Sequence, residues 1–375
     1  MIEKSDPIRL FLCGDVMTGR GIDQILPHPG DPRIYERASS SALLYVQLAE
    51  EVNGPIPKPV PFSYIWGDAL EIFHQVRPQF RIINLETAIT SSKEYWPAKG
   101  INYKMNPDNG PCLTAGGIDF CSLANNHVLD WSYPGLEETV QTLERLGIQF
   151  AGAGGSLREA RRPGILKSRT GSRVFVFSLG MESSGIPAEW EADIDRPGVF
   201  RVNSLSESRS LRFIRRSVDA IKRPGDIAIA SIHWGGNWGH VVPRRHRNFA
   251  HALIDEAGID LVHGHSSHHP KGIEVHRGRL ILYGCGDFIN DYEGISGYEE
   301  YRSELTLMYF PELDSATGKL ISLLMAPTRM KRLQVKRATE EETNWLLDLL
   351  RRTGKEWQTD VTLNDEGYLS LSWKD

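Results

Sequence analysis

The stretch Ile259–Tyr292, IDLVHGHSSHHPKGIEVHRGRLILYGCGDFINDY, contains five of the twelve histidines of the chain. Apolar runs lie on both sides of its histidine-rich part, a pattern that predicts a strand, a polar loop and two further strands. Neutral imidazole is the commonest metal-binding side chain. Loops at strand ends are a usual place for metal ligands. A solvated His-rich loop is the alternative, so the interpretation depends on whether other segments supply ligands in the same setting.

The composition is that of a globular protein with an ample core. The chain has 375 residues, of which 40% are hydrophobic and 24% charged, and its net charge of −5 disfavours nucleic acid as a partner. Apolar runs stay short of the roughly 20 residues that a membrane helix needs, so we expect no integral membrane segment. The four cysteines lack CxxC spacing, which indicates buried thiols and predicts a cytoplasmic protein.

Polar residues of the same kinds follow the other apolar runs. Short apolar runs that stop at glycine or polar residues predict buried strands feeding loops. The residues at these strand ends are Asp15, Glu86, Asn126 with His127, His233, and His265 with His268. A bridging carboxylate lets two cations sit within about 4 Å of each other. Mixed oxygen and nitrogen ligands suit Mn, Zn or Fe, so we expect one or two divalent metal ions.

Two regions between the first two predicted strands have patterns of their own. Residues 27–61 are rich in proline and glycine around a helical SALLYVQLAEEV, a long connection that suggests a lid insertion. Residues 63–76 predict a helix.

A (β/α)₈ amidohydrolase is an alternative architecture for these ligands. It needs an HxH pair at the first strand, whereas here that strand ends in Gly14-Asp15.

Six motifs in order carry a family resemblance. They are GDVMTGR, NLETAIT, ANNHVLD, HWG, GHSSH and YGCGDF, from residue 14 to residue 288. Together they resemble the CapA (poly-γ-glutamate capsule synthesis) family of the calcineurin-like metallophosphoesterase superfamily, over roughly residues 8–350. The resemblance implies an α/β fold, a four-layer α-β-β-α sandwich that is metallo-dependent phosphatase-like. We expect this domain to span residues 1–335, with residues 336–375 adding a C-terminal helix and strand that pack on it.

The resemblance also implies a ligand set. One metal would be held by Asp15, Glu86 and His268. Glu86 would bridge to a second metal, whose other ligands would be Asn126, His233 and His265. His127 matches the position of the superfamily's proton donor or transition-state stabiliser.

Further roles follow from the same resemblance. Asp130 would orient the catalytic histidine, and Arg20 would contact an anionic substrate. Met17 stands where the superfamily has the histidine of GDxH, which predicts a weakened first metal site. Asp287 replaces the more usual asparagine, and we expect it to be a strut, a general base or another ligand.

Remaining histidines are interpreted as structural or as pocket-lining residues. His263 is expected to be a hydrogen-bonded core residue, and His240 and His269 line the pocket or support it. The others are interpreted as surface or structural residues: His28, His74, His246, His251 and His276.

The expected chemistry is hydrolysis by metal-activated water at an acyl or phosphoryl centre, with His127 handling a proton. A peptide or γ-glutamyl anionic substrate is favoured, in a capsule or polyglutamate context. The alternatives are a metal-dependent peptide epimerase of the lasso-peptide type, a phosphoesterase, and a non-catalytic scaffold for polyglutamate synthesis. The sequence does not indicate the oligomeric state.

Overall fold

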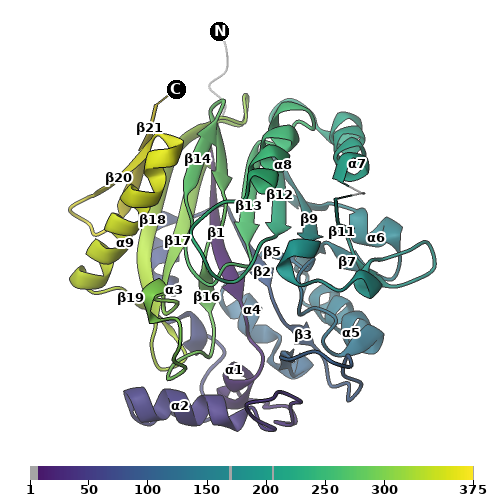
Figure 1. The fold of residues 1–375 in the computed structure, drawn as a ribbon, viewed down its shortest axis with the longest axis vertical. Coiled ribbons are helices and arrows are strands. Elements are labelled where there is room, and N and C mark those ends of the chain that lie inside the picture. Colours follow the sequence, from purple (N-terminus) through teal and green to yellow (C-terminus); the bar gives the residue numbers. More distant parts are fainter. Residues whose placement is uncertain (1–6, 169–170, 205–206, 375) are drawn as a thin grey trace.

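Two β-sheets lie face to face in the computed structural model, which describes residues 7–168, 171–204 and 207–374 (Figure 1). The first sheet has the order β20-β21-β18-β17-β1-β2-β5-β6, with β16 beside β1 and β19 beside β18. Its strands are β1 (Ile8–Val16), β2 (Phe80–Leu85), β5 (Phe120–Ser122), β6 (Gln149–Ala151), β16 (Asp287–Ile289), β17 (Leu305–Leu313), β18 (Leu320–Met330), β19 (Val335–Arg337), β20 (Thr359–Leu363) and β21 (Leu369–Trp373).

The second sheet has the order β11-β9-β12-β13-β15-β14, with β8 beside β9. Its strands are β8 (Gly164–Lys167), β9 (Arg173–Met181), β11 (Arg201–Val202), β12 (Ile227–His233), β13 (Leu261–His265), β14 (Ile273–His276) and β15 (Arg279–Leu282). Its central strands run parallel and are buried on both faces, which explains their continuous apolar sequences. Two further strand pairs are short: β3 (Ala88–Ile89) with β4 (Lys104–Met105), and β7 (Ala153–Gly154) with β10 (Gly198–Val199).

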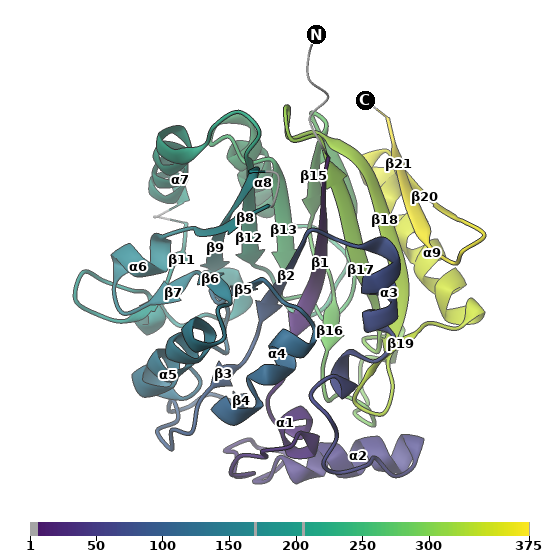
Figure 2. The same cartoon turned by 180° about the vertical axis from the view of Figure 1, so that it is seen from behind.

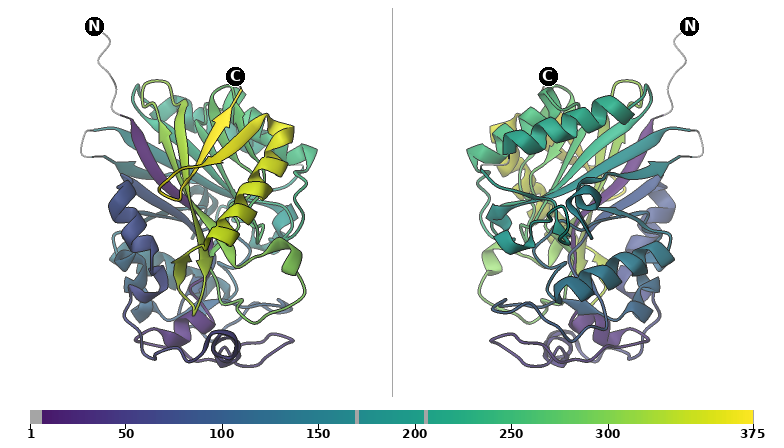
Figure 3. Two further views of the ribbon diagram at one scale, coloured as in Figure 1. Left: turned by 90° about the vertical axis from the view of Figure 1, so that its left-hand side faces the viewer. Right: turned by 90° about the vertical axis from the view of Figure 1, so that its right-hand side faces the viewer.

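Helices cover the outer faces of both sheets, while α1 and α2 lie below the strand ends in Figure 1. The helices are α1 (Gly21–Ile25), α2 (Leu43–Asn53), α3 (Ala69–Val76), α4 (Pro111–Ala115), α5 (Ser132–Arg145), α6 (Leu157–Arg161), α7 (Glu207–Ile221), α8 (Arg244–Asp255) and α9 (Glu340–Gly354). Figure 2 shows α3, α4 and α5 on the outer side of the first sheet. In the right-hand view of Figure 3 the helices of residues 207–255 lie in front of the second sheet.

The hydrophobic core has a layer between the sheets and a layer under each set of helices. Leu12 of β1 and Ile229 of β12 belong to the same buried cluster, which places the inner layer between the two sheets. Phe11, the neighbour of Leu12, points the other way and packs against Phe73 of α3. The expected four-layer α-β-β-α sandwich is confirmed.

The C-terminal segment joins both the sheet and the core. Strands β20 and β21 extend the first sheet beyond β18. Helix α9 begins with a capping box between Thr339 and Glu342, and its Leu346 and Leu350 enter the inter-sheet core.

The helix expected over residues 63–76 is interrupted. A 3₁₀ turn at Tyr64–Trp66 is followed by Gly67, which has φ of 44°, and α3 begins only at Ala69. A Cβ on Gly67 would lie 2.1 Å from the Val335 carbonyl oxygen, so the close approach of β19 breaks the helix here.

Candidate metal centre

Most side chains of the candidate centre lie at the carboxyl ends of parallel strands from both sheets, whereas Asp287 is the first residue of β16. In the first sheet, β1 pairs with β16 so that Asp15 lies beside Asp287. In the second, β12 pairs with β13 so that His233 lies beside His265. Parallel strands bring their carboxyl ends to the same edge of a sheet, which is where open α/β sheets bind ligands. In Figure 1 this edge is the lower end of β1, above α1 and α2.

Close backbone packing brings the two sets of strand ends together. A Cβ at Gly14 would lie 1.5 Å from the Gly286 carbonyl oxygen, so only glycine fits before Asp15. Ser266, just after β13, has φ of 97°, a conformation that is rare for serine and costly. This conformation points the Ser266 N–H at Asp15 Oδ2, at 3.1 Å. The strained residue therefore positions the carboxylate across the sheet boundary.

One group of ligand atoms consists of Asp15, His233 and His265, all buried. The two imidazole Nδ1 atoms are 2.8 Å apart, and each lies 4.0 Å from Asp15 Oδ1. Asn84 donates to the same Asp15 oxygen at 2.7 Å. Burial, followed by the neighbouring imidazoles, lowers the pKa of both histidines well below the usual range. Both rings are therefore neutral, the form that binds metals.

A second group consists of Asp15, His268 and Asp287. His268 Nδ1 lies 2.8 Å from Asp287 Oδ1, while Asn290 donates to Asp287 Oδ2 at 3.1 Å. Burial lowers the pKa of His268, but the facing Asp287 and Asp15 carboxylates outweigh it and leave the pKa raised. Asp15 therefore belongs to both groups, and Asp287 lies within ligand distance of one of them.

Glu86 was expected to bridge two metals, and the structure places it beside the first group. Its Oε1 lies 3.7 Å from His233 Nε2 and 3.7 Å from His127 Nε2, and its carboxyl interacts with that of Asp15. Its Oε2 is buried without a hydrogen-bond partner. Asn126 Oδ1 lies 2.8 Å from His233 Nε2. Glu86 and Asn126 thus lie on the Nε2 side of His233, whereas Asp15 and His265 lie on its Nδ1 side.

The donor set fits a divalent cation. Burial, and then the charge of Asp287, raises the pKa of Asp15 to about 7, and burial with Asp15 raises the pKa of Glu86 well above its usual range. Buried carboxylates without enough positive partners are unfavourable unless they are protonated or coordinate metals. Glu86 Oε2, which has no hydrogen-bond partner, and the two facing Nδ1 atoms carry lone pairs that a bound cation would accept.

His127 lies next to this centre, and its two nitrogens face different carboxylates. Its Nδ1 lies 2.6 Å from Asp130 Oδ2, and its Nε2 faces Glu86. Lys99 pairs with the other Asp130 oxygen at 2.9 Å and lies 3.4 Å from His127 Nδ1. Burial lowers the pKa of His127 to about 4, so the ring is neutral near pH 7. Because the Asp130 carboxylate only accepts, Nδ1 carries the proton and Nε2 presents a lone pair to the centre.

Arg20, expected to contact an anionic substrate, is already paired. Its guanidinium donates to Asp291 at 2.5 and 3.1 Å and to Glu36 at 3.2 and 3.3 Å, and it lies over the ring of Tyr45. Arg20 is 3% exposed. Its charge is balanced by these two carboxylates, so its observed contacts hold Glu36 of the 27–61 segment against the core.

Met17 stands at the position of the GDxH histidine, and its side chain points into the protein interior. Met17 is buried, and Tyr292 donates its hydroxyl to the thioether sulfur at 3.5 Å. A thioether is a soft ligand, unlike the imidazole that it replaces. The second group, with His268, therefore has one nitrogen ligand fewer than the GDxH motif would supply.

A cleft of about 740 Å³ opens beside His268. One wall comes from the 27–61 segment with Glu36, Tyr45 and Leu48. The opposite wall includes Trp238, whose ring stacks on Tyr298 at 4.1 Å. Because His268 lines it, the cleft opens onto one of the two candidate metal-binding groups.

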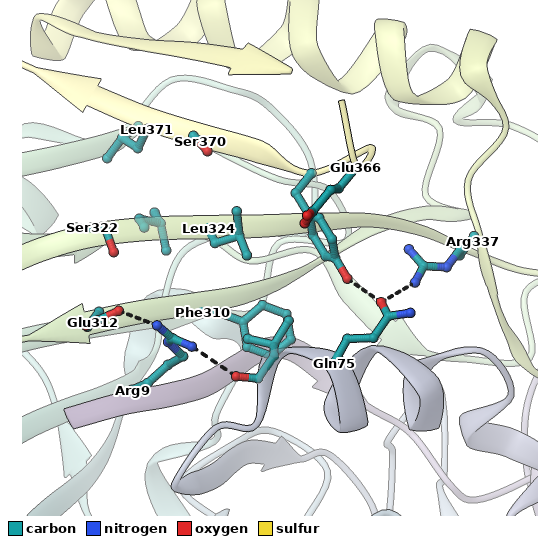
Figure 4. A pocket seen from close by; sticks show the side chains of 13 residues that line it. Arg9, Gln75, Phe310, Glu312, Ser322, Leu324, Arg337, Glu366, Ser370 and Leu371 are labelled. Carbon is teal, nitrogen blue, oxygen red and sulfur yellow. Dashed lines mark hydrogen bonds and ion pairs between the residues drawn. The ribbon is translucent and has the colours of Figure 1, made fainter. Parts of the chain in front are cut away.

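A cavity of about 700 Å³ lies elsewhere, on the outer face of the first sheet beside α3 (Figure 4). Several of its polar groups pair with one another. Arg9 pairs with Glu312 at 2.6 Å, and the Gln75 oxygen accepts from Arg337 and Tyr368 at 2.8 and 2.7 Å. It shares no residue with the metal-binding groups.

Sequence reasoning missed three residues of the centre. Asn84 stands in the NLE motif, and its amide links Asp15 to Asn125, whose side chain donates to Asn84 Oδ1 at 3.1 Å. Lys99 lies in a Pro/Gly loop without periodicity, so no signal marked it. Ser266 lies within the GHSSH motif, but its backbone conformation has no sequence signature. His263, in contrast, is the expected core histidine, with Nε2 2.7 Å from the Cys13 carbonyl.

A two-sheet sandwich whose strand ends converge on carboxylates and imidazoles defines a metallophosphoesterase-like α/β protein. The chain belongs to the PGA_cap family of bacterial capsule synthesis proteins, whose sequence profile matches residues 9–292. The resemblance expected from the six motifs is confirmed.

Three relatives illustrate the range of this family. The chain is 47% identical over 371 residues to a "Probable polyglutamine synthesis accessory protein" of Mycobacterium tuberculosis. This match covers 99% of this chain and 97% of the relative. It is 28% identical to "PGA biosynthesis protein CapA" of Bacillus subtilis over 64% of this chain and 60% of that protein. It is 22% identical to "Capsule biosynthesis protein CapA" of Bacillus anthracis over 77% of this chain and 61% of that protein. Among the described residues, no helix is long and apolar enough to span a membrane.

Proposed function

We propose that the protein is a metal-dependent hydrolase that cleaves an amide bond in a peptide or γ-glutamyl substrate, in the context of polyglutamate synthesis. The observation that carries this proposal is the convergence of two ligand groups on the single buried carboxylate of Asp15. The names of the relatives, which refer to polyglutamine and capsule synthesis, supply the context.

The chain would hold one cation with Asp15, His233 and His265, and a second with Asp15, His268 and Asp287. Asn126 and Glu86 lie on the Nε2 side of His233. When bound, divalent cations lower the pKa of a water molecule and polarise a carbonyl oxygen. Mn, Zn and Fe suit these mixed nitrogen and oxygen donors.

His127 has the right state for a general base. Its neutral ring is held by Asp130 with Nε2 free, on the side of Glu86. A water molecule would lose a proton to Nε2 as its oxygen forms a bond to the carbonyl carbon. The carbon–nitrogen bond then breaks, and the leaving amine takes the proton back from Nε2. Asp130 does not take up the proton, but stabilises the imidazolium and fixes the ring.

The cleft supports a peptide-like substrate rather than a small phosphate ester. Its walls mix stacked aromatic rings with charges of both signs, including Arg37 and Glu299, and its volume suits several residues of chain. We propose that residues 27–61 act as a lid over it, because Glu36 and Tyr45 form one wall. Arg20 anchors this lid through Glu36.

A second candidate function is peptide epimerisation. The same free Nε2 lone pair of His127 that would take a proton from water would also take one from a Cα atom next to a polarised carbonyl. This reaction needs no leaving group, and the two reactions differ in their products.

A panel assay in D₂O tests the proposal. Protein loaded with Mn²⁺ or Zn²⁺ is incubated with γ-glutamyl oligomers, α-peptides and phosphoesters, with His127→Ala as the control. We expect new amine termini from a γ-glutamyl or peptide substrate and about 10²–10⁴-fold less in the control. Deuterium at Cα without cleavage would establish epimerisation instead. Phosphate release alone would overturn the proposed substrate class, and no turnover of the panel would favour a non-catalytic scaffold.

A further inference from the structure

A second cluster of histidines and carboxylates lies on the second sheet, far from the central site. His251 and Asp255 stand one turn apart on α8, and Glu274 and His276 stand on the same face of β14. Glu274 pairs in register with Ile281, which pairs with Val262, three residues before His265. Three residues correspond to about 10 Å along a strand, and two strand spacings separate β14 from β13. The cluster therefore shares no residue with the central groups.

The side chains of this cluster point at one another. His251 Nε2 lies 3.0 and 3.1 Å from the two oxygens of Glu274, and His276 Nε2 lies 3.0 and 3.1 Å from those of Asp255. The two imidazole rings are parallel, with centroids 3.8 Å apart and an interplanar angle of 7°. One ligand atom from each of His251, Glu274 and His276 lies within 4.8 Å of the others.

We propose that these four residues, His251, Asp255, Glu274 and His276, form a structural Zn²⁺ site that ties α8 to the edge strand β14. Structural zinc is tetrahedral with distances of about 2.0–2.2 Å, which puts ligand atoms about 3.4 Å from one another. One ligand atom from each of His251, Glu274 and His276 already lies within 4.8 Å of the other two. Zinc binding would draw these atoms together and turn the stacked rings, and Asp255 would complete the site from its place beside His276. Two imidazoles and two carboxylates make a neutral site with Zn²⁺.

Ordinary ion pairs account for the cluster less well. If both rings were charged, two stacked cations would repel each other. If both are neutral, each carboxylate has one imidazole beside it and only a peripheral cation, Arg247 at 3.9 Å from Glu274 and Arg277 at 3.2 Å from Asp255. Arg277 is 71% exposed, so its charge is largely solvated. A divalent cation replaces the two Nε2 protons and balances both carboxylates at once.

The surroundings orient the ligands as an outer shell does in metal sites. The buried Tyr283 donates its hydroxyl to Glu274 Oε2 at 2.6 Å, which leaves Oε1 directed at His251. His276 precedes a two-residue hairpin turn in which Arg277 and Gly278 have φ of 52° and 76°. Tight turns of this kind fix the register of the two strands, so His276 is held in place.

Zinc content decides the proposal. Protein is saturated with Zn²⁺, dialysed against metal-free buffer and measured by elemental analysis, together with His276→Gln and the matched control His74→Gln, an exposed histidine of α3. We expect His276→Gln to hold one Zn²⁺ per chain fewer than the parent, while the control keeps the parental content. Equal content in His276→Gln and the parent would overturn the site.

A cobalt spectrum keeps this test separate from the central site. Co²⁺ in a tetrahedral site absorbs strongly in the visible range, so we expect this band in His265→Ala and its loss in the double variant His265→Ala/His276→Gln. A band of equal strength in the double variant would contradict the proposal, whatever the outcome of the activity panel. If the His265→Ala variants do not fold, the zinc content of His276→Gln still decides.

Discussion

Replacing Asp130 with asparagine changes one buried carboxylate that holds His127 in place. Asp130 Oδ2 accepts from His127 Nδ1 at 2.6 Å and from the backbone N–H of Tyr103 at 2.7 Å, and Oδ1 pairs with Lys99 at 2.9 Å. Asparagine has the same shape, but only one of its two positions accepts. With the oxygen toward His127, its amide group faces the Lys99 ammonium. With the amide reversed, the NH₂ group faces His127 Nδ1, so the ring must switch to the tautomer in which Nε2 carries the proton.

The magnitude follows from these contacts. A hydrogen bond to a charged group contributes about 1.5–3 kcal/mol and a neutral one about 0.5–1.5 kcal/mol. The change therefore weakens the orientation of His127 by about 1–2 kcal/mol, which corresponds to a rate loss of about 5- to 30-fold. His127→Ala removes the base itself and should cost about 10²–10⁴-fold. The double variant should be no slower than His127→Ala, because Asp130 acts through that ring.

The assay is amine release by the metal-loaded protein, with metal content and circular dichroism measured on every variant. Asp219→Asn is the matched control, because Asp219 lies exposed on α7 and pairs with Arg215 one turn away. In the parent, ¹⁵N chemical shifts of the His127 ring should report a protonated Nδ1, and Asp130→Asn should change them. Equal rate losses from Asp130→Asn in the parent and in the His127→Ala background would refute the reasoning.

Three further predictions concern stability, metal content and the cleft. Burial lowers the pKa of His246 from 6.5 to about 4. The unfolded chain therefore binds the proton first, and stability should fall by up to about 3 kcal/mol as the pH drops from 6.5 to 4; urea unfolding of His246→Gln should show a smaller fall. Met17→His should raise the Mn²⁺ content measured by elemental analysis, because it adds an imidazole ligand. It should also lower Tm, because a buried polar ring replaces an apolar side chain. Tyr298→Ala should raise KM more than it lowers kcat, because it removes the ring that stacks on Trp238.

Much of the central site was predictable because it depends on strand ends. Asp15, His233 and His265 each follow an apolar run, and such runs become buried strands whose ends meet at one edge. The four layers followed from the family motifs rather than from periodicity. The histidine pattern alone did not separate a metal site from a solvated loop.

The contacts between distant segments were not predictable. The sharing of Asp15 between two groups depends on the packing of Gly14 against Gly286 and on the strained Ser266. Neither has a local sequence signal. The expectation that Arg20 contacts a substrate came from its motif, which gave no sign of its ion pairs with Glu36 and Asp291, 16 and 271 residues away in the sequence. Side-chain pairing of this kind is decided by tertiary packing, which a single sequence does not reveal.

The most direct test of the central claim is anomalous diffraction from crystals of the Mn²⁺-loaded protein. The account predicts a peak at about 2.0–2.2 Å from ligand atoms of Asp15, His233 and His265, and a weaker peak between Asp15, His268 and Asp287 on the Met17 side. Asp15→Ala should lose both peaks, while His265→Ala should lose the first. A fully loaded protein with no peak at Asp15, or with its only peaks elsewhere, would contradict the account.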